Sequence, residues 1–190
     1  MGRGIAYAAA LAGYRTVLED VSPAMLEEGV AFIRAALERD VASGRATPQQ
    51  KERALANLST ARSVEDAYRQ ADLLIETVAE ELEVKLEIFT IFDRYGKPDA
   101  ILASTTRSLS IADLADMTFR KENCAGMRFS NPAAGTKMIE IVRTTETSDA
   151  TVNACVEVGR RMGRETAVIY EAPEAIPSGN ALKGARNENR

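Results

Sequence analysis

The longest helical pattern in the chain lies between residues 23 and 41. Ser22 is a favoured N-cap and Pro23 a favoured first helical residue, so the helix is expected to begin there. A Ser-Gly pair at 43–44 ends it, and a Thr-Pro pair at 47–48 begins a second helix that reaches about residue 57. The two helices therefore form a predicted hairpin. The apolar side chains of the first helix recur at helical spacing: Met25, Leu26, Val30, Ile33 and Leu37.

Short β-prone runs alternate with helical patterns along the rest of the chain. Strands are predicted at 16–19, 58–61, 73–75, 101–104 and 166–170, with two more inside 124–142. Further helices are predicted at 2–13, from 63 onward, and at 81–95, 111–117 and 148–162. Strands separated by helices on this scale are typical of a parallel sheet wrapped on both faces. We therefore predict an α/β fold, a doubly wound and mostly parallel sheet with a helical hairpin insertion.

Composition narrows the class of protein without identifying it. A net charge of -4 argues against nucleic acid as a partner, and no apolar run approaches the length of a membrane span. The chain has no histidine, which removes the commonest neutral-pH general base and the commonest metal ligand, and we expect no metal site. Cys124 and Cys155 do not share a ligand-type spacing, so we expect two buried thiols in a reducing cytoplasm. We find no signal-peptide pattern.

The first twenty residues carry part of a dinucleotide-binding pattern. Gly2 and Gly4 open a small apolar helix, and the following β-prone run ends at Asp20. In a doubly wound sheet, glycines let a pyrophosphate approach a helix N-terminus, and an acid after the second strand binds ribose hydroxyls. We expect the first strand of such a fold to be missing from this chain. An acid at Asp20 favours NAD over NADP, because a carboxylate repels a 2′-phosphate.

The segment CAGMRFSNPAAGTKMIEIV, at 124–142, has the pattern of two strands around a turn. It carries Glu140 inside an apolar run, where a carboxylate must find a partner. The segment resembles the catalytic segment of the (S)-3-hydroxyacyl-CoA dehydrogenases, in which a His precedes Phe-x-Asn-Pro and a Glu follows it. The resemblance implies Glu140 as the orienting acid and Asn131 as the Asn of that motif. Arg128 stands at the His position.

The resemblance extends over the chain to about residue 173 and implies further site residues. The run from Glu76 to Lys85 is similar to the family's E-A-[IV]-x-E-x-x-x-x-K pattern, so Glu80 and Lys85 would lie at the nicotinamide-side ribose. Without the family context, these two would be a solvated pair of charges. Thr105 stands at a cofactor-side Asn position and Arg107 at the position of a substrate-contacting Ser. Arg45 is a candidate contact for the phosphates of CoA.

The family's reaction is the reversible NAD-dependent oxidation of 3-hydroxyacyl-CoA to 3-ketoacyl-CoA, in fatty-acid metabolism. Arginine stays protonated near pH 7 and cannot replace the His as a proton acceptor. Two neighbouring guanidinium groups, Arg107 and Arg128, would fill and charge the pocket, or Arg128 would form a buried ion pair with Glu140. We therefore expect impaired activity. Two alternatives stay open, a non-catalytic fragment that binds a nucleotide or a protein, and another Rossmann-type oxidoreductase of hydroxy acids.

The domain organisation follows from composition and from the same resemblance. Residues 1–171 are predicted to form one NAD-binding, Rossmann-like domain. Residues 172–190 are rich in Pro, Gly and polar residues, and we expect a mobile tail that is a remnant of the link to an absent helical domain. Without its first strand the sheet would expose apolar surface, so we expect a homo-oligomer or a partner that covers it. The substrate implied by the resemblance is an acyl-CoA.

Overall fold

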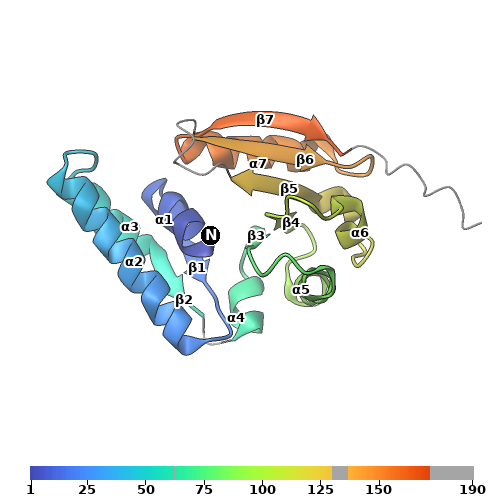
Figure 1. The fold of residues 1–190 in the computed structure, drawn as a ribbon, viewed down its shortest axis with the longest axis horizontal. Helices are drawn as coiled ribbons and strands as arrows, with labels where there is room; N and C mark the ends of the chain where they lie inside the picture. Colours follow the sequence, from blue (N-terminus) through green and yellow to red (C-terminus); the bar gives the residue numbers. More distant parts are fainter. Residues whose placement is uncertain (62, 130–136, 172–190) are drawn as a thin grey trace, which may run out of the picture.

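The computed structural model describes residues 1–61, 63–129 and 137–171, and helices alternate with strands along these ranges (Figure 1). The predicted Rossmann-like α/β fold is confirmed, and the hairpin α2/α3 is inserted between β1 and β2. The elements in chain order are α1 (Gly2–Leu11), β1 (Thr16–Leu18), α2 (Pro23–Ala42), α3 (Pro48–Asn57), β2 (Leu58–Thr60), α4 (Val64–Tyr68), β3 (Leu73–Glu76), α5 (Leu82–Tyr95), β4 (Ile101–Ser104), α6 (Ile111–Ala115), the 3₁₀ turn η1 (Lys121–Asn123), β5 (Cys124–Phe129), β6 (Met138–Arg143), α7 (Asp149–Arg161) and β7 (Glu165–Tyr170).

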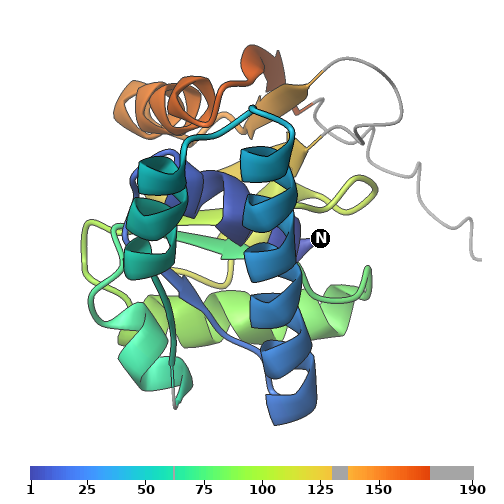
Figure 2. The same ribbon diagram turned by 90° about the vertical axis from the view of Figure 1, so that its left-hand side faces the viewer.

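The hairpin begins at the capping residues that the sequence contains. The Ser22 hydroxyl accepts a hydrogen bond from the Met25 N–H at 3.4 Å at the start of α2. Thr47 and Gln50 form a reciprocal capping box at the start of α3. Figure 2 shows the two helices side by side. Between them and the small helix α1 lies a compact apolar cluster, whose fully or nearly fully buried members are Ala6, Ala10, Ile33, Leu37 and Ala54.

The larger sheet has the strand order β3-β4-β5-β6-β7 and one antiparallel pair, β5 with β6. Helices α5 and α6 pack on one face of it, and α7 packs on the other together with Ile5 of α1. Both cysteines are buried free thiols, as expected. Gly126 is needed in the middle of β5, because a Cβ there would lie 2.8 Å from Val142 Cβ and 3.2 Å from Ile111 Cδ1.

The strands of the described residues form two sheets rather than one continuous sheet. β1 pairs only with β2, and β3 pairs only with β4, so the other edges of β1 and β3 carry no strand. Helix α1 packs against both sheets: it contacts β1 directly, and its residue Ile5 joins the core of the larger sheet. Val17 of β1 is 47% exposed. In the described residues, the two sheets are therefore joined through packing on α1 and not through hydrogen bonds between strands.

The open edge of β3 predicts an alternating pattern of amide hydrogen exchange. The Asp72 and Glu76 carbonyls accept from β4 at 2.9 and 3.3 Å, so by the period of a parallel ladder the Leu74 and Glu76 amides also point to β4. The Leu73 and Ile75 amides point to the open edge. We expect these two to exchange on the order of tenfold or more faster than the other two, as measured by NMR. Equal protection of all four amides would contradict an uncovered edge.

Candidate functional site

A buried ion pair lies where β3 ends and α5 begins. Lys85 Nζ donates to both carboxylate oxygens of Glu76, at 2.8 and 3.0 Å, and to the Val78 carbonyl at 3.4 Å. Both side chains of the pair are 1% exposed. Ser104, at the end of β4, donates its hydroxyl to the same carboxylate. The interpretation of Lys85 as one of a solvated pair of charges is therefore wrong, because its ammonium group is folded under the ends of two strands.

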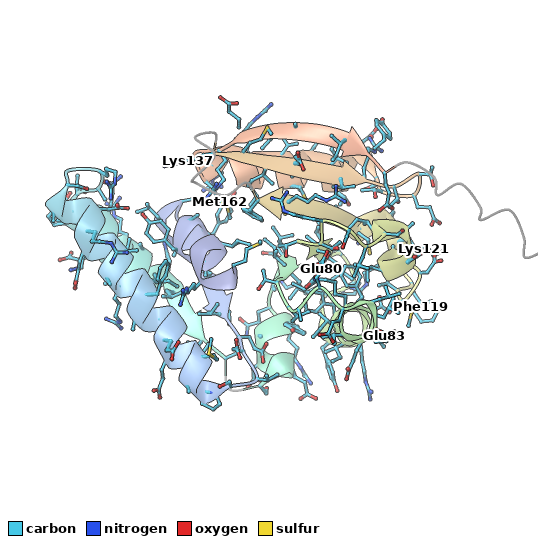
Figure 3. All side chains as sticks on the ribbon, viewed as in Figure 1. Glu80, Glu83, Phe119, Lys121, Lys137 and Met162 are labelled. Carbon is cyan, nitrogen blue, oxygen red and sulfur yellow. The ribbon has the colours of Figure 1, made fainter. Side chains whose placement is uncertain are left out.

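Glu80 holds the loop that follows β4. Its Oε1 accepts hydrogen bonds from the Thr106 hydroxyl at 2.5 Å, from the amides of Arg107 and Ser108 at 2.9 and 3.1 Å, and from the Ser108 hydroxyl at 2.9 Å. Its Oε2 lies 3.4 Å from Lys85 Nζ. Figure 3 shows Glu80 in the space between α5 and the strands β4 and β5. A single carboxylate thus links the buried pair to the loop.

The pKa of Glu80 reflects these contacts. Burial alone would raise it, but the hydrogen bonds from Thr106, Arg107 and Ser108 outweigh burial and lower the pKa from 4.5 to about 2. A lowered carboxyl pKa means that Glu80 contributes stability above pH 4.5, and that this contribution is lost as the pH falls toward 2. The side chain is 43% exposed, so solvent screening reduces the contribution to about 1 kcal/mol.

We therefore expect the Glu80→Gln variant to be less stable than the parent by about 1 kcal/mol at pH 7 and nearly equal to it only at and below pH 2. Urea denaturation at a series of pH values measures the difference. Glu83→Gln is the matched control, since Glu83 is an exposed acid three residues further on, in the first turn of α5 (Figure 3). A Glu80→Gln deficit that stays constant with pH would contradict a role for the ionised carboxylate.

Two arginines meet where the same loop passes the end of β5. Arg128 Nε donates to the Thr106 carbonyl at 2.9 Å, and Arg107 Nη2 donates to the Phe129 carbonyl at 2.8 Å. Thr106 and Arg107 are consecutive in the loop, and Arg128 and Phe129 are consecutive in β5. Each segment therefore contributes one arginine donor and one carbonyl acceptor. The structure therefore brings both predicted arginines to one junction, reciprocally tied across it.

Glu140 lies beside Arg128 but does not pair with it. The two residues are direct partners in the antiparallel register of β5 and β6, and both are half-buried. Of the two alternatives for Arg128, the ion pair with Glu140 is wrong, since no nitrogen of Arg128 is within 4.0 Å of a Glu140 oxygen in the described residues. The reason is the bond to Thr106, which turns the guanidinium group toward the loop after β4.

The structure describes some of the other predicted site residues and not others. Thr105 is buried directly after β4, and its amide donates to the Glu76 carbonyl at 3.3 Å. Asn131 lies in 130–136, outside the described residues, as does the predicted tail at 172–190. Ser104 and Thr106, which sequence reasoning did not select, hold the two carboxylates of the site. Glu76 is an acid at the end of the apolar run of β3. The pattern that singled out Glu140, an acid in an apolar run, could therefore also have identified Glu76.

The N-terminal glycines lie close to the end of β3. A Cβ on Gly2 would be 2.7 Å from the hydroxyl of Thr77, while a Cβ on Gly4 would meet nothing within 4 Å. Asp20 follows β1, is exposed, and accepts from the Ser22 amide at 2.9 Å through Oδ1. Gly2 thus packs against the protein's own Thr77, and the open space at Gly4 and the acid after β1 are the features compatible with a bound dinucleotide.

Arg45 lies away from this edge, at the tip of the hairpin. Its Nε and Nη2 contact Asp40 Oδ1 at 2.8 and 2.6 Å, and its side chain is 65% exposed. Tyr7 donates its hydroxyl to the same carboxylate, and burial followed by this contact raises the pKa of Tyr7 to about 12. A role for Arg45 at the phosphates of CoA stays a prediction, and it requires the guanidinium to serve Asp40 and the phosphate together.

Within the described ranges, no group of three or more His, Cys, Asp or Glu side chains could hold a metal ion. Over the same ranges, no helix combines the length and the apolar character that a membrane crossing requires.

The chain was compared with known proteins. Residues 1–172 match the family model of the 3-hydroxyacyl-CoA dehydrogenase NAD-binding domain. The chain is 40% identical over 176 residues to a 3-hydroxybutyryl-CoA dehydrogenase of Bradyrhizobium diazoefficiens, an alignment that covers 93% of this chain and 60% of that protein. A probable 3-hydroxybutyryl-CoA dehydrogenase of Bacillus subtilis is 34% identical over 91% of this chain and 60% of its own length.

Solved structures give the same result. The (S)-3-hydroxybutyryl-CoA dehydrogenase PaaH1 of Ralstonia eutropha superposes with a TM-score of 0.85 at 32% identity, covering 91% of this chain and 61% of that one. The 3-hydroxybutyryl-CoA dehydrogenase of Escherichia coli gives the same TM-score and identity over 91% of this chain and 36% of that one. The chain spans about 60% of the length of the curated relatives named above. It belongs to the 3-hydroxyacyl-CoA dehydrogenase family and corresponds to that family's NAD-binding domain.

Proposed function

We propose that this chain binds NAD and takes part in oxidoreduction of 3-hydroxyacyl-CoA compounds, with proton transfer impaired at Arg128. The observation that carries the proposal is the match of residues 1–172 to an NAD-binding domain, together with an arginine at the edge where the site residues gather. When bound, NAD would accept a hydride, and in the reverse direction NADH would donate one. Gly2 and Gly4 would lie at the pyrophosphate, Asp20 at the adenosine ribose, and Glu80 near the nicotinamide ribose, with the buried Lys85 behind Glu80.

The residues of the junction would set the environment of the substrate. Glu80 holds the loop that carries Thr105 and Arg107, so Thr105 would face the cofactor and Arg107 the substrate in one fixed arrangement. Arg128 can donate hydrogen bonds to an oxygen but cannot accept its proton near pH 7. Losing a general base typically reduces the rate by about two to four orders of magnitude. Glu140 and Asn131 complete the proposed set of catalytic residues.

A second candidate function is nucleotide binding without turnover. It is favoured by the same arginine, since a site that lacks a proton acceptor can retain the cofactor and lose the chemistry. The two candidates agree on NAD binding and differ only in turnover.

Titration of NADH by fluorescence, followed by acetoacetyl-CoA-dependent NADH oxidation, tests the proposal on the purified chain. Binding with slow turnover that rises in the Arg128→His variant would support the first candidate. Binding with no turnover in either form would support the second. Absence of NADH binding would overturn both. Turnover in the parent that equals the Arg128→His variant would overturn the claim that Arg128 impairs proton transfer.

A further inference from the structure

The junction of Arg107 and Arg128 contains two cations without a carboxylate partner in the described part of the chain. Neither guanidinium group lies within 4.0 Å of an Asp or Glu oxygen there. The nearby carboxylate of Glu80 is already held by the loop and by Lys85. Arg107 is exposed, but Arg128 is half-buried, and a half-buried guanidinium group without a counter-ion loses hydration without gaining Coulombic attraction. The junction therefore favours an anionic ligand.

The contacts also orient the two arginines. Arg128 uses Nε for Thr106 and Arg107 uses Nη2 for Phe129, each with a backbone carbonyl at 2.8–2.9 Å. These bonds fix the planes of the guanidinium groups and leave their other N–H nitrogens out of the described backbone contacts. Arginine N–H groups in a fixed plane match the two oxygens of a carboxylate. Fixing them before binding lowers the entropy that binding would cost.

The charge of the junction indicates how much negative charge the ligand carries. Arg107 and Arg128 contribute two positive charges, and Glu140, the register partner of Arg128, contributes one negative charge without forming an ion pair. The sum favours a singly charged group over a doubly charged phosphate. The location fits a ligand as well, because α/β sheets bind ligands beyond the carboxyl ends of their strands, where β4 and β5 end here.

We propose that Arg107 and Arg128 bind a carboxylate group, so that the substrate class of this site is a carboxylate-bearing acyl compound rather than one whose reacting end is a neutral 3-ketone. This inference rests on the proposed function for the position of the substrate, and it adds the charge of the group that enters. Glu140 then opposes the ligand electrostatically, and Arg107 and Arg128 hold it from two sides.

Butyrate and butyramide are the probes, since the two molecules have nearly the same shape and differ in charge. NMR of the arginine side-chain Nε–H groups follows the titration. We expect butyrate to shift the signals of Arg107 and Arg128 with a Kd on the order of 1–10 mM, and butyramide to leave them in place. Shifts of equal size with both probes, or no saturable shift with butyrate, would overturn the proposal.

Variants identify the residues responsible. Arg128→Lys keeps the charge and loses the planar fork, and Arg107→Gln removes an exposed charge; each should weaken butyrate binding at least about tenfold. Glu140→Gln should strengthen it a few-fold. Arg53→Gln, at an exposed position of α3, is the matched control and should change nothing. Equal weakening by Arg53→Gln would indicate non-specific attraction and overturn the site.

Two further arms separate the outcomes. Inorganic phosphate that binds at least about tenfold more tightly than butyrate would overturn the carboxylate assignment in favour of a phosphoryl group. NADH titration on the same samples separates this inference from the proposed function. Butyrate binding without NADH binding leaves the carboxylate site standing and removes the cofactor proposal, while NADH binding without butyrate binding does the reverse.

Discussion

Replacing Lys85 with methionine is expected to destabilise the folded domain by about 3–5 kcal/mol, because the substitution leaves the Glu76 carboxylate buried without its cation. The two groups are 2.8 Å apart, and both side chains are 1% exposed. Methionine keeps most of the volume of the lysine stem, so the decrease in stability reports the loss of the charge and not a loss of packing. Urea denaturation followed by circular dichroism measures the free energy of unfolding.

Lys97→Met provides the matched control for this prediction. Lys97 also pairs with an acid, Asp72, at 2.6 Å, but Asp72 is 91% exposed. A surface pair of this kind contributes about 0–1 kcal/mol, so the control variant should be nearly as stable as the parent. The double variant Glu76→Gln/Lys85→Met removes both charges and should recover part of the loss. Equal effects of the two lysine substitutions would show that burial of the Lys85–Glu76 pair has no energetic role.

Removal of the Glu171 carboxylate, by substitution with alanine, is expected to cost about 2–3 kcal/mol. Glu171 follows β7, and its two oxygens accept from the Ile111 and Ala112 amides at 2.6 and 2.9 Å, at the start of α6. Both contacts are charge-assisted, and helix N-termini favour a negative charge. The last strand is thereby tied to the helix that follows the Thr105–Ser110 loop.

Glu165→Ala is the control for this second prediction, since Glu165 is an exposed acid at the other end of the same strand. It should change the free energy of unfolding by no more than about 0.5 kcal/mol. Glu171→Gln keeps an acceptor oxygen and should fall between the parent and the alanine variant. Thermal and urea unfolding of the three variants measure these differences. A Glu171→Ala variant as stable as Glu165→Ala would contradict a stabilising contact between Glu171 and the start of α6.

Much of the fold could be predicted because its signals are local. Ser22-Pro23 and Thr47-Pro48 start helices by satisfying the first free amides, and the structure has both caps in place. Strands that alternate with helices predict a parallel sheet, because a helical crossover brings the chain back to begin the next strand at the same end of the sheet. The division into two sheets depends on which strands are neighbours in space. That information is not contained in any single strand, so the sequence pattern could not show it.

The sequence predicted which residues belong to the candidate site better than it predicted their contacts. Arg128, Glu140 and Glu80 were selected from a family motif, and the structure places Arg128 near the end of β5, Glu140 opposite it within β6, and Glu80 in the loop between β3 and α5. The expected Arg128–Glu140 ion pair is wrong because a backbone carbonyl, Thr106 O, competes for the guanidinium group. Backbone acceptors have no signature in the sequence. Lys85 was expected at a ribose, and its burial under β3 and β4 depends on the distant Ser104 and Glu76.

The divided sheet has a consequence for the cooperativity of unfolding. A continuous sheet couples its strands through hydrogen bonds, so that local openings are rare until the whole domain unfolds. Here the unit of β1, β2 and the hairpin has a small core of its own, and helix α1 is the element that packs on both this unit and the larger sheet. We therefore expect the smaller unit to open first, in an unfolding transition of two steps that the release of α1 separates.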